Sequence, residues 1–116
     1  MTRFLVLTAC AMALPIGAAA FERVEDRDTF VDLVSDRDLK RFGITLQVSE
    51  NGAIQGRAFG QDVTGQWRWS NGYFCRDLYY GSRDLGPNCQ TVEIKGETMR
   101  FTSDQGAGMS ANLKLD

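Results

Sequence analysis

The sequence predicts a mainly β protein, a small antiparallel β-barrel or sandwich built as a meander, with one short N-terminal helix. The first observation is a period of two: Ile44, Leu46 and Val48 alternate with polar residues, as in a strand with one buried face. The second is the recurrence of glycines and Asn-Gly steps at roughly eight- to twelve-residue intervals, which is typical of short strands joined by tight turns. Together these observations favour antiparallel pairing over an α/β arrangement.

One helix is expected at about residues 28–35. Phe30, Leu33 and Val34 fall at positions i, i+3 and i+4, which places them on one helical face. An aspartate at position 26 or 28 can cap the first turn through its carboxylate. After the helix, we expect strands near residues 39–41, 44–49, 53–59, 65–70, 73–80, 89–94, 98–102 and 109–115.

Hairpin registers follow from matching the apolar faces, because a slip of one residue turns every side chain to the opposite face. A three-residue turn at 50–52 sets Val48 opposite Ile54. A two-residue turn at 95–96 sets Val92 opposite Met99.

The turn at Asn71-Gly72 decides which aromatic residues face inward. A two-residue turn gives the inner face Trp67, Trp69, Phe74, Arg76, Leu78 and Tyr80, whereas a three-residue turn brings in Tyr73, Asp77 and Tyr79. We favour the two-residue turn. Cys89 is out of phase with Val92 and therefore points outward, so its partner should point outward too.

Composition restricts the possible chemistry. The chain has 116 residues, a formal net charge of −2 and no histidine. The length rules out a Rossmann enzyme or a (β/α)₈ barrel, which need about 200 residues or more. The lack of histidine removes the commonest general base and the commonest metal ligand. The sequence has no stripe of basic residues that would indicate nucleic-acid binding, and it has no cluster of residues that would predict a bound metal or cofactor.

Residues 1–20 have the three parts of a secretory signal. One basic residue precedes an apolar run, and Ala18 and Ala20 form an A-x-A cleavage site. Cys10 follows a sequence like a lipoprotein cleavage box, but its apolar segment is short, so we interpret it as part of the signal. Residues 21–116 then form a single β-rich domain. We expect it to be periplasmic or secreted, without stable membrane insertion, and monomeric.

Cleavage would leave two cysteines, Cys75 and Cys89. An even pair in an exported chain predicts a disulfide, because the compartment is oxidising. Two free thiols are the alternative.

Arg76 is the sharpest candidate for a functional residue. An arginine on the inner face of a barrel beside Trp67, Trp69 and Tyr80 could hold an anionic or aromatic ligand by charge and stacking. The alternative is a structural arginine whose guanidinium packs on Trp67 as a cation–π pair. The polar loop over residues 81–88, between the cysteines, could instead present a binding epitope.

Several short motifs resemble a known family. They include Gly65-Gln66-Trp67-Arg68-Trp69, Gly72-Tyr73-Phe74-Cys75-Arg76 and Asn88-Cys89-Gln90. Together they resemble a family of short exported proteins of Gram-negative bacteria with no established function. Its members often carry the name dihydrodipicolinate reductase. This sequence has no Gly-x-Gly-x-x-Gly between a strand and a helix and no histidine, so the resemblance carries over no catalytic residue.

The sequence therefore predicts two possible functions. The first is a non-catalytic binding module for a protein or another envelope component. The second is a carrier of a small anionic or aromatic ligand inside the barrel, through Arg76 and the tryptophans. An enzyme is the least favoured reading.

Overall fold

The computed structural model describes residues 20–116. The expected signal peptide, including Cys10, lies outside the described residues except for Ala20. The elements are β1 (Glu22–Val24), α1 (Arg27–Val34), β2 (Leu39–Arg41), β3 (Ile44–Val48), β4 (Ala53–Ala58), β5 (Gln61–Ser70), β6 (Tyr73–Tyr80), β7 (Arg83–Asp84), β8 (Asn88–Lys95), β9 (Thr98–Thr102), the 3₁₀ turn η1 (Asp104–Gly106) and β10 (Ser110–Leu115).

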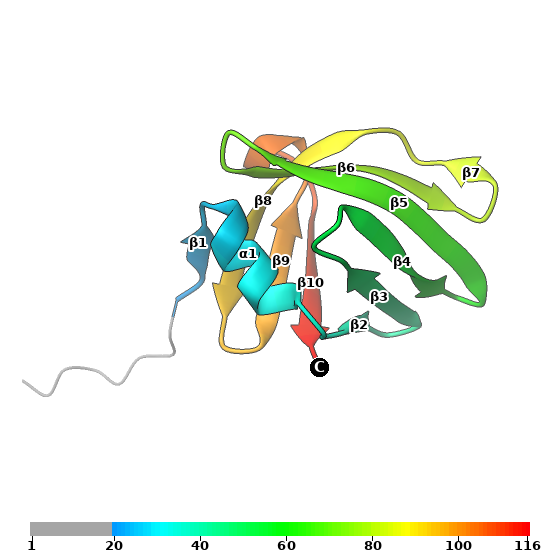
Figure 1. Ribbon diagram of the computed structural model, residues 1–116, viewed down its shortest axis with the longest axis horizontal. Helices are drawn as coiled ribbons and strands as arrows, with labels where there is room; N and C mark the ends of the chain where they lie inside the picture. The colour runs from blue at the N-terminus through cyan, green and yellow to red at the C-terminus, as the bar shows by residue number, and fades with distance from the viewer. Residues whose placement is uncertain (1–19) are drawn as a thin grey trace, which may run out of the picture.

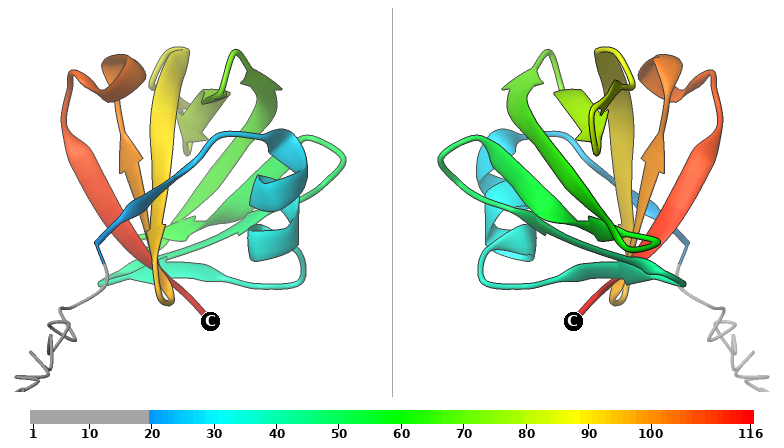
Figure 2. Two further views of the ribbon diagram at one scale, coloured as in Figure 1. Left: turned by 90° about the vertical axis from the view of Figure 1, so that its left-hand side faces the viewer. Right: turned by 90° about the vertical axis from the view of Figure 1, so that its right-hand side faces the viewer.

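The strands form a closed antiparallel barrel, which confirms the predicted fold class. Neighbouring strands follow the order β8-β9-β10-β2-β3-β4-β5-β6, and β6 pairs back with β8 to close the ring of eight. β1 and β7 attach outside this ring, to β8 and β6. In Figure 1 the strands curl into the barrel and α1 lies against it, between β1 and β2. Figure 2 shows from both sides that the C-terminus lies beside the β8–β9 turn, where the Leu115 amide donates to the Glu97 carbonyl.

Two of the three predicted hairpin registers are confirmed. Val48 lies opposite Ile54. Trp67 lies opposite Arg76 across the Asn71-Gly72 turn. In that turn both residues have positive φ, 52° and 82°, and an Asn-Gly pair adopts this conformation readily.

The predicted register of the β8–β9 hairpin is wrong by two residues. Val92 lies opposite Phe101 rather than Met99, and Lys95 pairs with Thr98. The turn therefore consists of residues 96 and 97 instead of 95 and 96. A slip of two residues keeps every side chain on the same face, so matching of apolar faces could not distinguish the two registers. Gly96, with φ of 57°, occupies the first turn position because glycine adopts positive φ without steric cost.

The boundaries of several elements differ from the predictions. β5 begins at Gln61, four residues before the expected start. The very short strands β1 and β7 were not predicted. They have only three and two residues, too few for an alternating pattern to be recognised. η1 lies between the expected strands over residues 98–102 and 109–115.

Helix α1 begins where the sequence allows a cap. The Asp26 carboxylate accepts a hydrogen bond from the Thr29 amide at 3.1 Å and another from the Thr29 hydroxyl at 2.8 Å. These bonds stabilise the ionised carboxylate, the hydroxyl bond most strongly, and they lower the pKa of Asp26 from its ordinary value. The helix buries Phe30, Val31 and Val34; Leu33, expected on the same face, is only partly buried.

Phe30 anchors the helix in the barrel. It is fully buried, and its ring centroid lies 5.2 Å from that of Trp67, 5.1 Å from Trp69 and 5.1 Å from Phe74. Phe101 adds an edge-on contact at 6.4 Å. Aromatic groups in these offset and edge-to-face arrangements attract each other beyond the effect of burial. One helical side chain thus joins β5, β6 and β9.

The predicted disulfide joins Cys75 to Cys89. The two residues lie directly opposite each other on β6 and β8. Both flanking residues of Cys75, Phe74 and Arg76, line the barrel interior, so Cys75 points to the outer face as predicted. The bond crosslinks the strand pair that closes the barrel.

Phe30→Ala should lower the free energy of unfolding by about 3–5 kcal/mol, because it removes a fully buried ring and leaves a cavity. Chemical denaturation followed by circular dichroism measures this. Phe42→Ala is the matched control, since Phe42 is 94% exposed and its loss should change stability by less than about 0.5 kcal/mol. Equal effects of the two variants would contradict this assignment of the core.

Replacing both cysteines, Cys75→Ala and Cys89→Ala, should lower the free energy of unfolding by about 3 kcal/mol. The two residues are 14 apart in sequence, and closing a loop of that size in the unfolded chain accounts for this amount. The same denaturation experiment, run also on the wild type with a reductant, checks it. Unchanged midpoints in both cases would contradict it.

Candidate functional site

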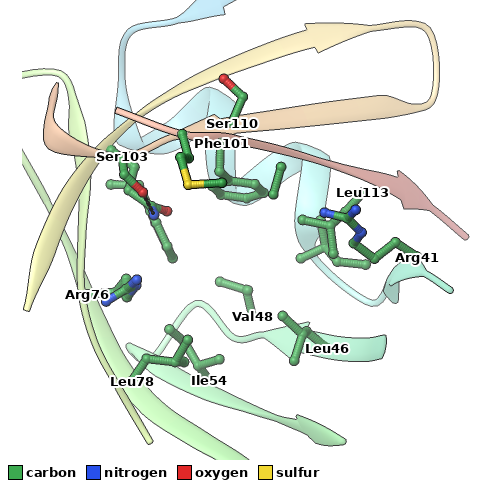
Figure 3. A pocket seen from close by; sticks show the side chains of 15 residues that line it. Arg41, Leu46, Val48, Ile54, Arg76, Leu78, Phe101, Ser103, Ser110 and Leu113 are labelled. Atoms are coloured by element: carbon green, nitrogen blue, oxygen red, sulfur yellow. Dashed lines mark hydrogen bonds between the residues drawn. The ribbon is translucent and has the colours of Figure 1, made fainter. Parts of the chain in front are cut away.

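The barrel contains a pocket with a volume of about 370 Å³, within the range of small-molecule sites. Its lining is mostly apolar and also contains two arginines, one glutamine and two serines. The apolar lining residues are Leu39, Leu46, Val48, Ile54, Phe74, Leu78, Phe101, Met109, Ala111 and Leu113, and the polar ones are Arg41, Arg76, Gln90, Ser103 and Ser110. Figure 3 shows the labelled side chains arranged around an unfilled centre.

The pocket arises where the barrel wall is incompletely paired. β10 and β2 are neighbours, but they pair only at Lys114–Lys40 and Leu115–Leu39. Beyond these pairs the first half of β10 has no partner on β2, and its residues Ser110 and Ala111 line the pocket. Met109, just before β10, also lines it and is 86% exposed. The pocket therefore opens to solvent on this side.

Arg76 projects into the pocket from β6. The register opposite Trp67 fixes its inward direction, and Figure 3 shows its guanidinium at one side of the cavity. Nη1 donates a hydrogen bond to the Gly86 carbonyl at 2.8 Å. Partial burial of the guanidinium lowers the pKa of Arg76, while the charge of nearby Asp77 acts in the opposite direction. The charge is partly desolvated.

Among residues 20–116, no carboxylate lines the pocket. Asp84 of β7 and Asp104 of η1 accept hydrogen bonds from other groups within the described chain. Asp84 Oδ1 accepts a hydrogen bond from the Gly86 amide at 2.7 Å, and Asp104 Oδ1 accepts one from Asn88 Nδ2 at 2.8 Å. Arg76 therefore has a neutral carbonyl as its hydrogen-bonding partner and no ion pair in residues 20–116.

Two further polar groups lie near Arg76. Gln90 is buried opposite Phe74 on the neighbouring strand, and its Nε2 donates to Ser103 Oγ at 3.2 Å. The segment after β9 is held to β8 by Asn88, whose Oδ1 also accepts a hydrogen bond from the Asp104 amide at 3.0 Å. Arg76, Gln90 and Ser103 make this side of the pocket rich in hydrogen-bond donors, and we call these three residues the polar end.

The tryptophans predicted to accompany Arg76 do not line the pocket. Trp67 is buried against Phe30 and its Nε1 donates to the Ser49 carbonyl at 2.8 Å; Trp69 Nε1 donates to the Glu25 carbonyl at 3.1 Å. Tyr80, opposite Val63, is also absent from the lining. The structure thus brings only Arg76 of the four predicted ligand-binding residues to the cavity.

The cation stacked on Trp67 is Arg27 of the helix, at 5.3 Å from the ring centroid. Its Nη2 also donates to the Glu50 carbonyl at 2.7 Å. The structural role considered for Arg76, a cation–π pair with Trp67, is therefore filled by another residue.

Arg41 is the pocket residue that sequence reasoning missed. Strand alternation places Leu39 and Arg41 on the pocket side of β2, where Leu39 is buried and Arg41 is exposed, and Lys40 on the other side, where it pairs with Asp116 at 2.7 Å. Figure 3 shows the Arg41 side chain reaching toward the pocket beside Leu113, across the cavity from Arg76. The available signal was its spacing of two from Leu39 in the expected strand over residues 39–41.

Comparison of the chain with protein-family models, curated proteins and solved structures gave no match. The resemblance to short exported bacterial proteins therefore stays a prediction. Within residues 20–116, no helix is long and apolar enough to cross a bilayer, and no group of three or more potential metal-ligating side chains comes together. The disulfide is compatible with an extracellular or periplasmic location.

Arg76→Met should change the free energy of unfolding by less than about 1 kcal/mol. Loss of the hydrogen bond to Gly86 is offset by removal of a partly desolvated charge. Denaturant titration beside Arg68→Met, an exposed arginine on the outer face of β5, measures the difference. A loss above about 2 kcal/mol for Arg76→Met alone would show that the arginine serves mainly to hold the fold together.

Proposed function

We propose that this protein is an exported, non-catalytic binding protein that carries a small organic anion in its barrel. The observation that carries the proposal is the Arg76 guanidinium, half-buried on the wall of an apolar pocket with no carboxylate in the lining. Partial removal of a charge from water is unfavourable unless an opposite charge compensates for it. A bound anion would supply that charge.

The lining also supports a ligand with an apolar body. Ten of the fifteen lining residues are apolar, so a purely ionic ligand such as phosphate would leave most of the wall unused. Burial of an apolar body against this wall contributes roughly 25 cal/mol per Å². The polar end would orient the charged group, which is the usual division of roles in small-molecule sites.

Native mass spectrometry of the protein purified from the periplasm of its expressing cells tests this proposal. We expect a non-covalent small-molecule adduct that leaves on denaturation and is absent or strongly reduced in Arg76→Met. The same spectra report cleavage after Ala20 and the two-proton loss of the disulfide. The proposal would be contradicted if neither the wild type nor Arg76→Met carried an adduct and calorimetry detected no binding of added octanoate to the wild type.

A second candidate function, binding of a protein partner, is favoured by two exposed aromatic residues. Phe42 and Phe59 are 94% and 66% exposed on the neighbouring β2–β3 and β4–β5 turns, which a hydrogen bond from the Phe59 amide to the Gly43 carbonyl connects. Phe59 has φ of 51°, a conformation that bulky side chains rarely adopt. If the spectra show no adduct, crosslinking of the wild type against Phe42→Ala/Phe59→Ala would identify this role.

A further inference from the structure

The pocket has a second cationic group on the side opposite the polar end. Arg41 lines the cavity from β2, and Figure 3 shows Arg41 and Arg76 on opposite sides of it. Between the two lie aliphatic side chains, among them Leu46, Val48 and Leu78. The pocket thus has a positively charged side chain on each of two opposite sides and an apolar wall between them.

Arg41 has no partner among the described residues, in contrast to several other arginines of the barrel. Arg37 pairs with Glu97, Arg57 with Asp62, and Arg100 donates to Asn112. For Arg41 there is no side-chain hydrogen bond or ion pair within residues 20–116, although Lys40 beside it pairs with Asp116. Its guanidinium donors therefore remain available to a ligand.

The wall between the two arginines determines what can connect two anionic groups. Branched aliphatic side chains dominate it, and the aromatic groups that could stack on a planar ligand, Trp67 and Trp69, are packed on Phe30. A flexible aliphatic chain can bind to such a wall because burial of its apolar surface is favourable and needs no specific contact. The pocket volume of about 370 Å³ is enough for such a chain, since small-molecule sites have volumes from about 300 Å³ upward.

We propose that the pocket selects an α,ω-dicarboxylate with an aliphatic spacer, with one carboxylate on Arg76 and the other on Arg41. This inference rests on the proposed binding function and goes further, because it names the ligand class and assigns the second anchor. Guanidinium and carboxylate groups match in bidentate geometry. The Arg76 contact is the more sheltered of the two, and the Arg41 contact, being exposed, provides discrimination rather than most of the affinity.

The test compares dicarboxylates from butanedioate to decanedioate with monocarboxylates of the same chain length, by isothermal titration calorimetry on the full disulfide-bonded protein. For wild type, octanedioate should bind about three- to tenfold more tightly than octanoate. Arg41→Gln should abolish this preference and leave octanoate binding within about twofold of wild type. Arg76→Met should weaken both ligands.

The matched control is Arg68→Gln, which removes one positive charge from the outer face of β5 and does not line the pocket. It should retain the preference for octanedioate, so a loss caused by net charge alone would be recognised. Equal affinity of wild type for the two ligands, or a preference that survives Arg41→Gln, would overturn the inference while the proposed function stands. Failure of every mono- and dicarboxylate to bind would overturn both.

Discussion

The pairing between β6 and β8 is the contact on which the rest of this structure depends. It involves only three residue pairs, Phe74–Gln90, Cys75–Cys89 and Arg76–Asn88, yet without it the ring of eight strands would be open between β6 and β8. A closed barrel has no unpaired edge in its ring and encloses an interior. The disulfide at the middle pair adds a covalent bond to this short pairing.

The same three pairs also determine what the interior contains. Because side chains alternate along a strand, placing Cys75 outside places both Phe74 and Arg76 inside. Phe74 then joins the aromatic group around Phe30, and Arg76 enters the cavity beyond that group. The barrel interior is thereby divided into a packed part under helix α1 and an unfilled part with a charged wall.

The unfilled part follows from how the chain builds its wall. A barrel of eight strands is just wide enough for side chains to fill or for one small ligand to bind. Here the helix and its aromatic contacts fill one part, while the divergence of β10 from β2 leaves the other part open. A ligand with an apolar body and a negative charge would complete the packing and compensate the Arg76 guanidinium.

The fold class, the helix, most strands, the disulfide and the inward direction of Arg76 could all be predicted from the amino-acid sequence. These depend on local periodicity, turn residues and the parity of strand positions, all of which are visible in one chain. A slip of two residues at the β8–β9 turn preserves that parity, so only the structure could set this register. The contact of Trp67 and Trp69 with helix α1 could not be predicted in this way, because their partner, Phe30, lies far away in the sequence. Nor could the position of Arg41 across a cavity from Arg76 be predicted, since that relation depends on how β2 and β6 curve around the barrel.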